Sequence, residues 1–419
     1  MAVGMPRRKY PAANRKIAPA TSGKIDTYKY RDALDFPAID RAGLSDADST
    51  CVYAEPPGVN RKFPRHPPEF IDDPDGVELF PEFRPDTITY SPAFVAAALR
   101  ARVVGFRTVL TEDGTFFLDN SPIGSTHRQH VLRDLVSPDT FGEETGFEAT
   151  PEPGRVVLDA RGRSTKRIKK TTVLLSSQEP SNFGSWLFRV LPKLQTLAQI
   201  GFDEPKRYLV WVGLPSFMEY LGVLGIRKEQ IIPQYPTNVI YQLDRVIVPS
   251  NRNNHAFLDP ESVAFYAGLR DRFGEPSASG EKIYVSRLNH SQVGASTRVM
   301  INERDLIEHL VQIGFRIVAP EALSVPEQIR TFSSAQMVVG PSGSGMFNIV
   351  YCRPGTKVID IESEPHWIHA HRCLFSSCGM RYGIFVGKAE DKDFSRHHKP
   401  WTLNVDALIS RVLSFSQSS

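Results

Sequence analysis

Two patterns of apolar and polar positions alternate along this chain. Short apolar runs typical of buried strands are separated by stretches in which apolar residues recur every three or four positions, as on one face of a helix. The predicted strands are 101–110, 116–119, 155–158, 172–175, 207–212, 245–249, 282–286, 315–318, 336–339 and 357–361. The predicted helices are 186–200, 215–224, 260–273, 303–313, 324–334, 344–352 and 402–414. This order of elements predicts an α/β protein with parallel sheets.

Residues 1–85 show neither pattern. Closely spaced prolines from Pro56 to Pro85 would break any helix that formed there. We therefore expect an irregular, partly disordered extension over 1–85 that drapes over the folded body. Because 419 residues exceed one ordinary core, we expect two domains, at 86–258 and 259–400. The segment 401–419 is predicted to be a helix and tail that pack back on the first domain.

Composition narrows the class of protein. Hydrophobic residues make up 41% and charged residues 23%, as in globular proteins, and the net charge of +3 argues against a nucleic-acid partner. No stretch reaches the roughly 20 apolar residues of a membrane helix, which predicts a cytoplasmic protein. Two basic segments, 1–24 and 161–170, are either solvated surface or peripheral contacts with the inner face of a membrane. The four cysteines are interpreted as reduced thiols.

A glycine-rich loop is the strongest local signal. Gly340, Gly343 and Gly345 lie between the predicted strand 336–339 and the predicted helix 344–352. Glycine lets a backbone approach a ligand closely, and a helix N-terminus offers N–H groups and a positive dipole end. The spacing is neither a Walker A loop nor a dinucleotide fingerprint. The pattern predicts an anion site, with a tight turn that binds nothing as the alternative.

Charged residues stand at two neighbouring strand ends. Arg287 follows the strand 282–286, and Asp360 and Glu362 close the strand 357–361. Parallel sheets bind ligands at the carboxyl ends of their strands. Arginine can form forked hydrogen bonds with phosphate, and an acid can accept hydrogen bonds from ribose hydroxyls. With the glycine loop, these residues favour a nucleotide site.

Six sequence blocks follow one another between residues 283 and 361. They read Tyr284-Val-Ser-Arg287, Arg298-Val-Met-Ile-Asn-Glu303, Gly314-Phe-Arg-Ile-Val-Ala-Pro-Glu321, Glu327-Gln-Ile-Arg-Thr-Phe-Ser-Ser-Ala335, Gly340-Pro-Ser-Gly-Ser-Gly-Met-Phe-Asn348 and Pro354-Gly-Thr-Lys-Val-Ile-Asp360. A weaker block upstream reads Asn182-Phe-Gly-Ser-Trp-Leu-Phe-Arg-Val-Leu-Pro-Lys-Leu194. In content and order these blocks resemble glycosyltransferase family sixty-one, whose bacterial members are of the capsular-polysaccharide type. The resemblance covers roughly 90–390 and is strongest from 280 onward.

The resemblance implies a fold and an activity. The fold would be of the GT-B type, with two facing Rossmann-like domains, of which 86–258 takes the acceptor and 259–400 the nucleotide-sugar donor. The activity would be an inverting transfer, without a metal or other cofactor, to a polysaccharide, lipid-linked or other glycan acceptor. The implied donor-binding residues are Arg287, Arg298, Asn302, Ser342, Gly343, Ser344, Gly345, Asn348, Asp360 and Glu362. The implied acceptor-side residues are Asn182, Ser185, Trp186 and Arg189, with the alternative that Trp186, like Phe188 and Leu191, is a core residue facing the sheet.

Two departures from the family pattern affect the chemistry. The family has histidine where this chain has Ser185 and Ser342, and serine cannot replace imidazole as a proton acceptor near neutral pH. The candidate general bases are therefore His255, in a polar loop between the two domains, and Glu303. The alternative is a catalytically impaired protein of the same fold that binds nucleotide sugars or acts as a scaffold.

The region from His366 to Cys378 is rich in histidine and cysteine. Its spacing fits no standard zinc motif. Simple packing, a helix lining the donor cleft near Trp367 or His371, and a zinc site remain open as interpretations, and no metal is expected.

Overall fold

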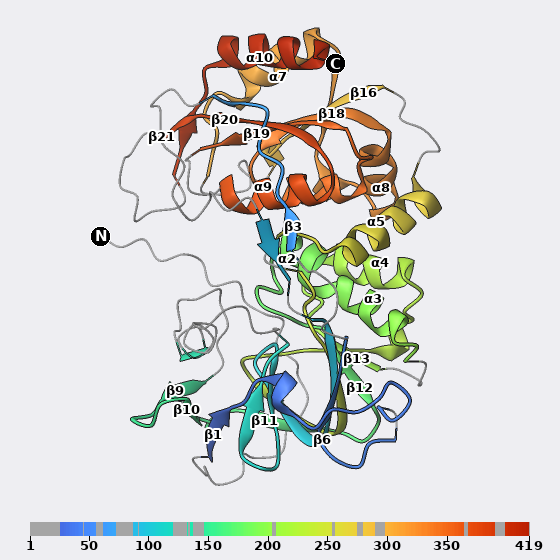
Figure 1. The fold of residues 1–419 in the computed structure, drawn as a ribbon. Helices are drawn as coiled ribbons and strands as arrows, with labels where there is room; N and C mark the ends of the chain where they lie inside the picture. The colour runs from blue at the N-terminus through green and yellow to red at the C-terminus, as the bar shows by residue number, and fades with distance from the viewer. Residues whose placement is uncertain are drawn as a thin grey trace, which may run out of the picture.

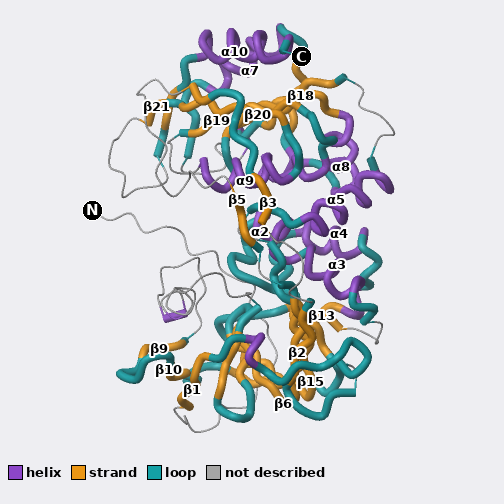
Figure 2. Tube along the Cα trace, in the orientation of Figure 1, coloured by secondary structure: helices purple, strands orange, loops and turns teal. Residues whose placement is uncertain are grey.

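The computed structural model describes most of the chain as two β-sheets with helices between and outside them (Figures 1 and 2). The described residues are 26–44, 46–55, 62–72, 87–90, 92–119, 132, 135–136, 146–202, 207–253, 256–274, 280–289, 298–363, 368–389 and 399–418. The α/β class predicted from the alternating elements is confirmed.

The first sheet combines a parallel part with a mostly antiparallel part. In the parallel part, β14 (Ile231–Pro233), β13 (Arg207–Val210), β12 (Thr172–Leu174) and β15 (Val239–Pro249) lie side by side. The sheet continues from β15 through β6 (Phe94–Val104), β7 (Thr108–Leu110), β8 (Thr115–Phe117), β1 (Asp26–Tyr30), β10 (Arg155–Leu158) and β9 (Phe147–Ala149). Two further strands, β11 (Ser164–Ile168) and β2 (Cys51–Ala54), pair with β15 and β6. Among these strands the predicted parallel arrangement holds for β11 to β15, and the other pairings are antiparallel except for that of β1 with β8.

The predicted strand 101–110 is in fact two strands joined by a turn. Gly105 has φ of 64°, a left-handed conformation that glycine adopts at little cost, and it reverses the chain between β6 and β7. The predicted hairpin at 112–115 is confirmed, because β7 and β8 pair antiparallel on either side of it.

The prediction of an irregular lead-in was wrong for the described parts of residues 26–72. Strands β1 and β2 join the first sheet, and a 3-10 turn, η1 (Ala33–Asp35), lies between them. Strand β3 (Lys62–Pro64) pairs with β5 (Thr87–Thr89), and β4 (Ile71–Asp72) pairs with an edge strand of the second sheet. The hydrogen-bond partners of these short strands lie far away in the sequence, so the local sequence pattern does not predict the pairing.

The second sheet is entirely parallel. Its order is β17 (Phe315–Val318), β16 (Glu281–Val285), β18 (Ala335–Pro341), β19 (Lys357–Glu362), β20 (Arg381–Val386) and β4. The chain starts at β16, runs outward to β17, and then crosses back to β18 on the other side of β16. In such doubly wound sheets the crevice at this reversal is where ligands bind, at the carboxyl ends of the strands.

Helices cover both faces of the second sheet. One face carries α7 (Glu303–Gln312) and α10 (Val405–Gln417), and the other carries α8 (Val325–Ser334), the 3-10 helix η6 (Ser344–Tyr351) and α9 (Ile368–Ser377). Helix α8 begins with a capping box, in which the Ser324 and Glu327 side chains each accept a hydrogen bond from the other residue's backbone N–H.

A helical layer joins the two sheets (Figure 1). It contains α2 (Phe183–Ser185), the π-helical turn η3 (Trp186–Val190), α3 (Pro192–Gln199), α4 (Pro215–Val223) and α5 (Pro260–Phe273). One hydrophobic cluster runs through this layer into the second sheet, and the Phe188 and Phe347 rings stack across it with centroids 5.4 Å apart. The two halves therefore share a continuous core.

The closing helix was placed wrongly by the sequence analysis. Helix α10 packs beside α7 on the outer face of the second sheet and not on the predicted domain 86–258 (Figure 1). Its Leu408 and Val412 are fully buried there, and Arg411 forms a forked ion pair with Asp72 of β4, with Nη2 and Oδ1 2.8 Å apart. Amphipathic spacing identified the helix but not the sheet that it covers.

None of the helices in the described part of the chain combines the length and the apolar character that a membrane crossing requires. All four cysteines are buried free thiols, as expected.

Candidate active site

A cavity of about 770 Å³ opens where the carboxyl ends of β16 and β18 meet the helical layer. The second half lines it with the β16 and β18 ends, the 3-10 turn η5 (Pro320–Ala322) and the starts of α8 and η6. The first half contributes the starts of α2 and α4. The cavity coincides with the strand-order reversal between β16 and β18, where a doubly wound sheet is expected to bind its ligand.

Arg287 is the cationic group of this cavity. Its guanidinium Nη1 donates a hydrogen bond of 2.8 Å to the Ser342 carbonyl oxygen, so the arginine is fixed against the glycine loop. Burial and the neighbouring Arg298 lower the pKa of Arg287 to about 10, which leaves the side chain charged at neutral pH. A buried cation that lies near a second cation is stabilised when an anion binds beside it. The geometry therefore suits a phosphate-bearing ligand.

Glu303 fixes the end of β16 from behind. Its Oε1 atom accepts hydrogen bonds from the Ser286 hydroxyl at 2.9 Å and the Arg287 backbone N–H at 2.8 Å, with the Tyr284 hydroxyl at 3.3 Å. The side chain is 1% exposed and is not among the residues that line the cavity. In this structure Glu303 positions Arg287, and the geometry gives no support to its predicted role as a general base.

The glycine loop brings the backbone to the cavity. The Ser342 N–H donates to the Ile361 carbonyl at 2.8 Å, which ties the loop to β19. Gly343 is extended and serves as the N-cap of η6, and Ser344 and Gly345 line the cavity. The first N–H groups of a helix have no partners within the helix, so this start offers donors to an anion beside Arg287.

Replacing Gly343 with alanine should disrupt the contact between the Arg287 guanidinium and the glycine loop. A Cβ atom on residue 343 would lie 2.4 Å from Nη1 of Arg287, so the guanidinium must move. We expect Gly343→Ala to weaken nucleoside-diphosphate binding at least tenfold by isothermal titration, with a nearly unchanged melting temperature. Gly222→Ala is the matched control, because a Cβ atom there meets no atom within 4 Å. Unchanged affinity would show that the Arg287 position is not needed for binding.

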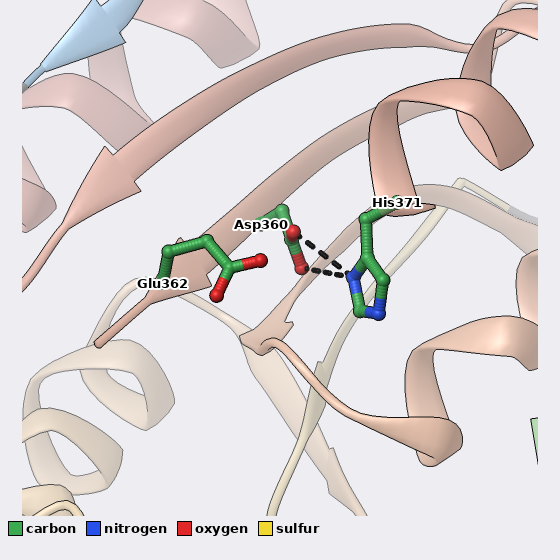
Figure 3. Close-up of side chains that lie close together, drawn as sticks. All are labelled: Asp360, Glu362 and His371. Atoms are coloured by element: carbon green, nitrogen blue, oxygen red, sulfur yellow. Dashed lines mark hydrogen bonds and ion pairs between the residues drawn. The ribbon is translucent and has the colours of Figure 1, made fainter. Parts of the chain in front are cut away.

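Asp360, Glu362 and His371 form a buried cluster behind the loop (Figure 3). His371 Nδ1 lies 3.0 Å from both Asp360 carboxylate oxygens. Burial and the charge of Asp360 raise the pKa of Glu362 well above its ordinary value. None of the three lines the cavity, and the loop approaches them through the Ser342 hydroxyl, which lies 3.4 Å from His371 Nδ1. The predicted ribose contacts by the two acids would need a rearrangement.

Other predicted donor residues are divided between the cavity and the interior. Asn348 lines the cavity, and its side-chain amide donates to the Gly345 carbonyl at 3.0 Å. Arg298 is close enough to act on the pKa values of Arg287 and Glu362. Asn302 does not line the cavity, and both ends of its amide bind the backbone of Leu403, far along the chain before α10.

The structure places one of the four predicted acceptor-side residues, Asn182, at the cavity. It lines the cavity, and its side chain caps α2 by accepting from the N–H groups of Gly184 and Ser185. The Ser185 hydroxyl donates to the Gln178 carbonyl, and Trp186 stacks in the core on Phe217, with centroids 3.9 Å apart. The helical spacing of Trp186 also fits a core residue that faces the sheet, and its burial agrees with that interpretation.

Arg189 and His255 complete the set of predicted residues. Arg189 forms an ion pair with Glu179 at 2.6 Å and does not line the cavity. His255 lies outside the described residues, and its predicted role as a base stays a prediction.

Sequence reasoning missed part of the cavity wall. The turn after β17 and the start of α8 contribute Pro320, Glu321, Leu323 and Gln328, and the start of α4 contributes Leu214, Pro215 and Ser216. A signal for the first group was available, because β17 was predicted and its carboxyl end must lie beside those of its parallel neighbours.

Comparison with known proteins agrees with the sequence motifs. Residues 183–359 match the family model described as Glycosyltransferase 61. This segment contains the cavity residues from Phe183 of α2 to Asn348 of η6, and the match supports the resemblance to that family. No curated protein matches the chain.

Proposed function

We propose that this protein is a glycosyltransferase that takes a sugar from a nucleotide-sugar donor. The proposal rests on one observation above all. Arg287 and the glycine loop are hydrogen-bonded to each other beside a cavity at the strand-order reversal, within the segment that matches the glycosyltransferase family model. A turn that binds no ligand would not need a buried cation hydrogen-bonded to its backbone.

The donor diphosphate is proposed to lie between Arg287 and the start of η6. The guanidinium and the N–H groups of Ser344 and Gly345 would offset the charge that develops as the nucleoside diphosphate departs, without a metal bridging the phosphates. The nucleoside would extend toward the wall formed by η5 and Gln328, at the carboxyl end of the neighbouring strand β17. The acceptor would approach from the α2 and α4 side.

The proposed architecture is of the GT-B type. The parallel second sheet with its reversed order and the parallel part of the first sheet support it, as does the cavity between the two halves. The antiparallel extension of the first sheet and the packing of α10 on the second sheet are features of this chain that the proposal must accommodate.

The reaction proposed is an inverting displacement onto a glycan acceptor, such as a capsular polysaccharide or a lipid-linked sugar. The acceptor oxygen forms a bond to the anomeric carbon as the bond from that carbon to the phosphate oxygen breaks. The acceptor proton passes to a general base, and the nucleoside diphosphate leaves as the anion. His255 remains the proposed base, since Glu303 is engaged elsewhere and Ser185 and Ser342 lack an imidazole.

Two measurements test the proposal. Isothermal titration of the purified chain against a panel of nucleoside diphosphates should identify one that binds at micromolar concentration. Incubation with the corresponding nucleotide sugars should then release nucleoside diphosphate, faster when a glycan acceptor is added. Binding without release would favour the catalytically impaired alternative. If none of the panel binds, the donor site does not exist.

A further inference from the structure

The cluster of Asp360, Glu362 and His371 is brought together by strand alternation and helix placement. Asp360 and Glu362 are two residues apart on β19, so their side chains leave the same face of the sheet. Helix α9 covers that face and brings His371 to them (Figure 3). One atom that can bind a metal from each residue lies within 4.8 Å of the others.

The burial of these groups is costly in this arrangement. Asp360 and Glu362 are 0% exposed and His371 is 5% exposed. Neither carboxylate oxygen of Glu362 forms a hydrogen bond of good geometry among the described residues, although the Ser342 hydroxyl and the Asp360 carboxyl are close enough to act on its pKa. Two adjacent buried carboxylates repel each other, and an unpartnered buried carboxylate loses its solvation. Arg298 offsets part of this charge, since it acts to lower the pKa of Glu362.

We propose that Asp360, Glu362 and His371 bind a divalent transition-metal ion, such as Zn²⁺ or Mn²⁺. Ligand atoms about 2.0–2.2 Å from an ion in tetrahedral coordination lie about 3.3–3.6 Å apart, so the three side chains, whose ligand atoms lie within 4.8 Å of one another, need shifts of about 1 Å to bind one ion. The imidazole nitrogen favours a transition metal over Mg²⁺ or Ca²⁺, which prefer oxygen ligands. The ion would neutralise both carboxylates and satisfy Glu362.

The ion would have a positioning role for the glycine loop. The cluster lies behind Ser342, whose carbonyl holds Arg287 and whose N–H binds β19. The Phe347 and Phe375 rings pack against His371 and enclose the site from η6 and α9. A metal here would join β19 to α9 beneath the loop, within the protein and apart from the cavity. The proposal is independent of the proposed transferase activity, because its readout is metal content.

The test uses the full chain without a purification tag, stripped with a chelator and then dialysed against Zn²⁺ or Mn²⁺. Elemental analysis should find one ion per chain, and titration should show a single site. Glu362→Gln and His371→Ala should each weaken binding at least 100-fold. His309→Ala is the matched control, because His309 and Asp305 form an exposed histidine–carboxylate pair, with Nδ1 and Oδ1 3.3 Å apart.

A second measurement covers the case in which the variants fold poorly. The melting temperature of the wild-type chain should rise with saturating Zn²⁺ or Mn²⁺ and return to the stripped value with chelator. Binding of less than one ion per chain, wild-type affinity in Glu362→Gln, or loss of binding in His309→Ala would each overturn the proposal. In that event a shared proton satisfies the two carboxylates.

Discussion

Replacing Arg287 with alanine is expected to weaken nucleoside-diphosphate binding about 100-fold or more and to reduce sugar transfer in proportion. A hydrogen bond to a charged group contributes about 1.5–3 kcal/mol, and every 1.4 kcal/mol is a factor of ten in affinity. Arg287 is placed to make such bonds with phosphate, and it also holds the loop through the Ser342 carbonyl. Both contributions are lost in the variant, and isothermal titration measures their sum.

Two further variants make this result interpretable. Arg287→Lys keeps the charge but not the planar fork, so it should bind with intermediate affinity. Arg316→Ala removes an arginine of the same sheet that lies on the surface, where it pairs with Glu281, and should bind like the wild type. If Arg287→Ala is folded, as its melting temperature would show, and still binds nucleoside diphosphate with wild-type affinity, the diphosphate does not bind at this strand end.

Replacing Lys193 with methionine is expected to cause the largest loss of stability, about 3–5 kcal/mol, measured as a marked fall in melting temperature. Lys193 and Asp119 are both 0% exposed, and Nζ lies 2.7 Å from Oδ2 of the aspartate and 2.9 Å from the Ser176 carbonyl. The Ser177 hydroxyl donates to the same carboxylate at 2.6 Å. Without Lys193 the buried carboxylate loses its principal counter-charge.

The pKa of Asp119 shows how strongly this pair is coupled. Burial alone would raise the pKa of the carboxyl, but Lys193 and Arg107 outweigh it, and the pKa lies below its ordinary value. The double variant Asp119→Asn, Lys193→Met should be less destabilised than Lys193→Met, since the buried carboxylate that loses Lys193 is itself removed, although Arg107 then loses its ion pair with Asp119. Lys228→Met, at an exposed lysine of the same half, should leave the melting temperature unchanged. A loss below 1 kcal/mol in Lys193→Met would contradict this account.

The local sequence was sufficient to predict a helix or strand wherever the residues of that element alone determine its structure. The helices at 260–273 and 324–334 were predicted to within one residue, because Asp259 and Ser324 cap them and proline stands in their first turns. Arg287 and Gly345 were placed at one site because parallel strands end at a common edge, and the cavity confirms that they meet there. The direction of individual side chains was harder to predict, as the hydrogen bonds between the Asn302 amide and the Leu403 backbone show.

The amino-acid sequence by itself determined the α/β class, the strand-to-helix glycine loop and the charged residues at the strand ends, because periodicity, capping and glycine placement are local properties. Only the tertiary structure decided which sheet α10 covers, that β4 completes the second sheet, and that His371 joins Asp360 and Glu362. Each of these depends on contacts between segments far apart in the chain. Burial and hydrogen-bond satisfaction choose among such contacts, and they become defined only when the whole chain is packed.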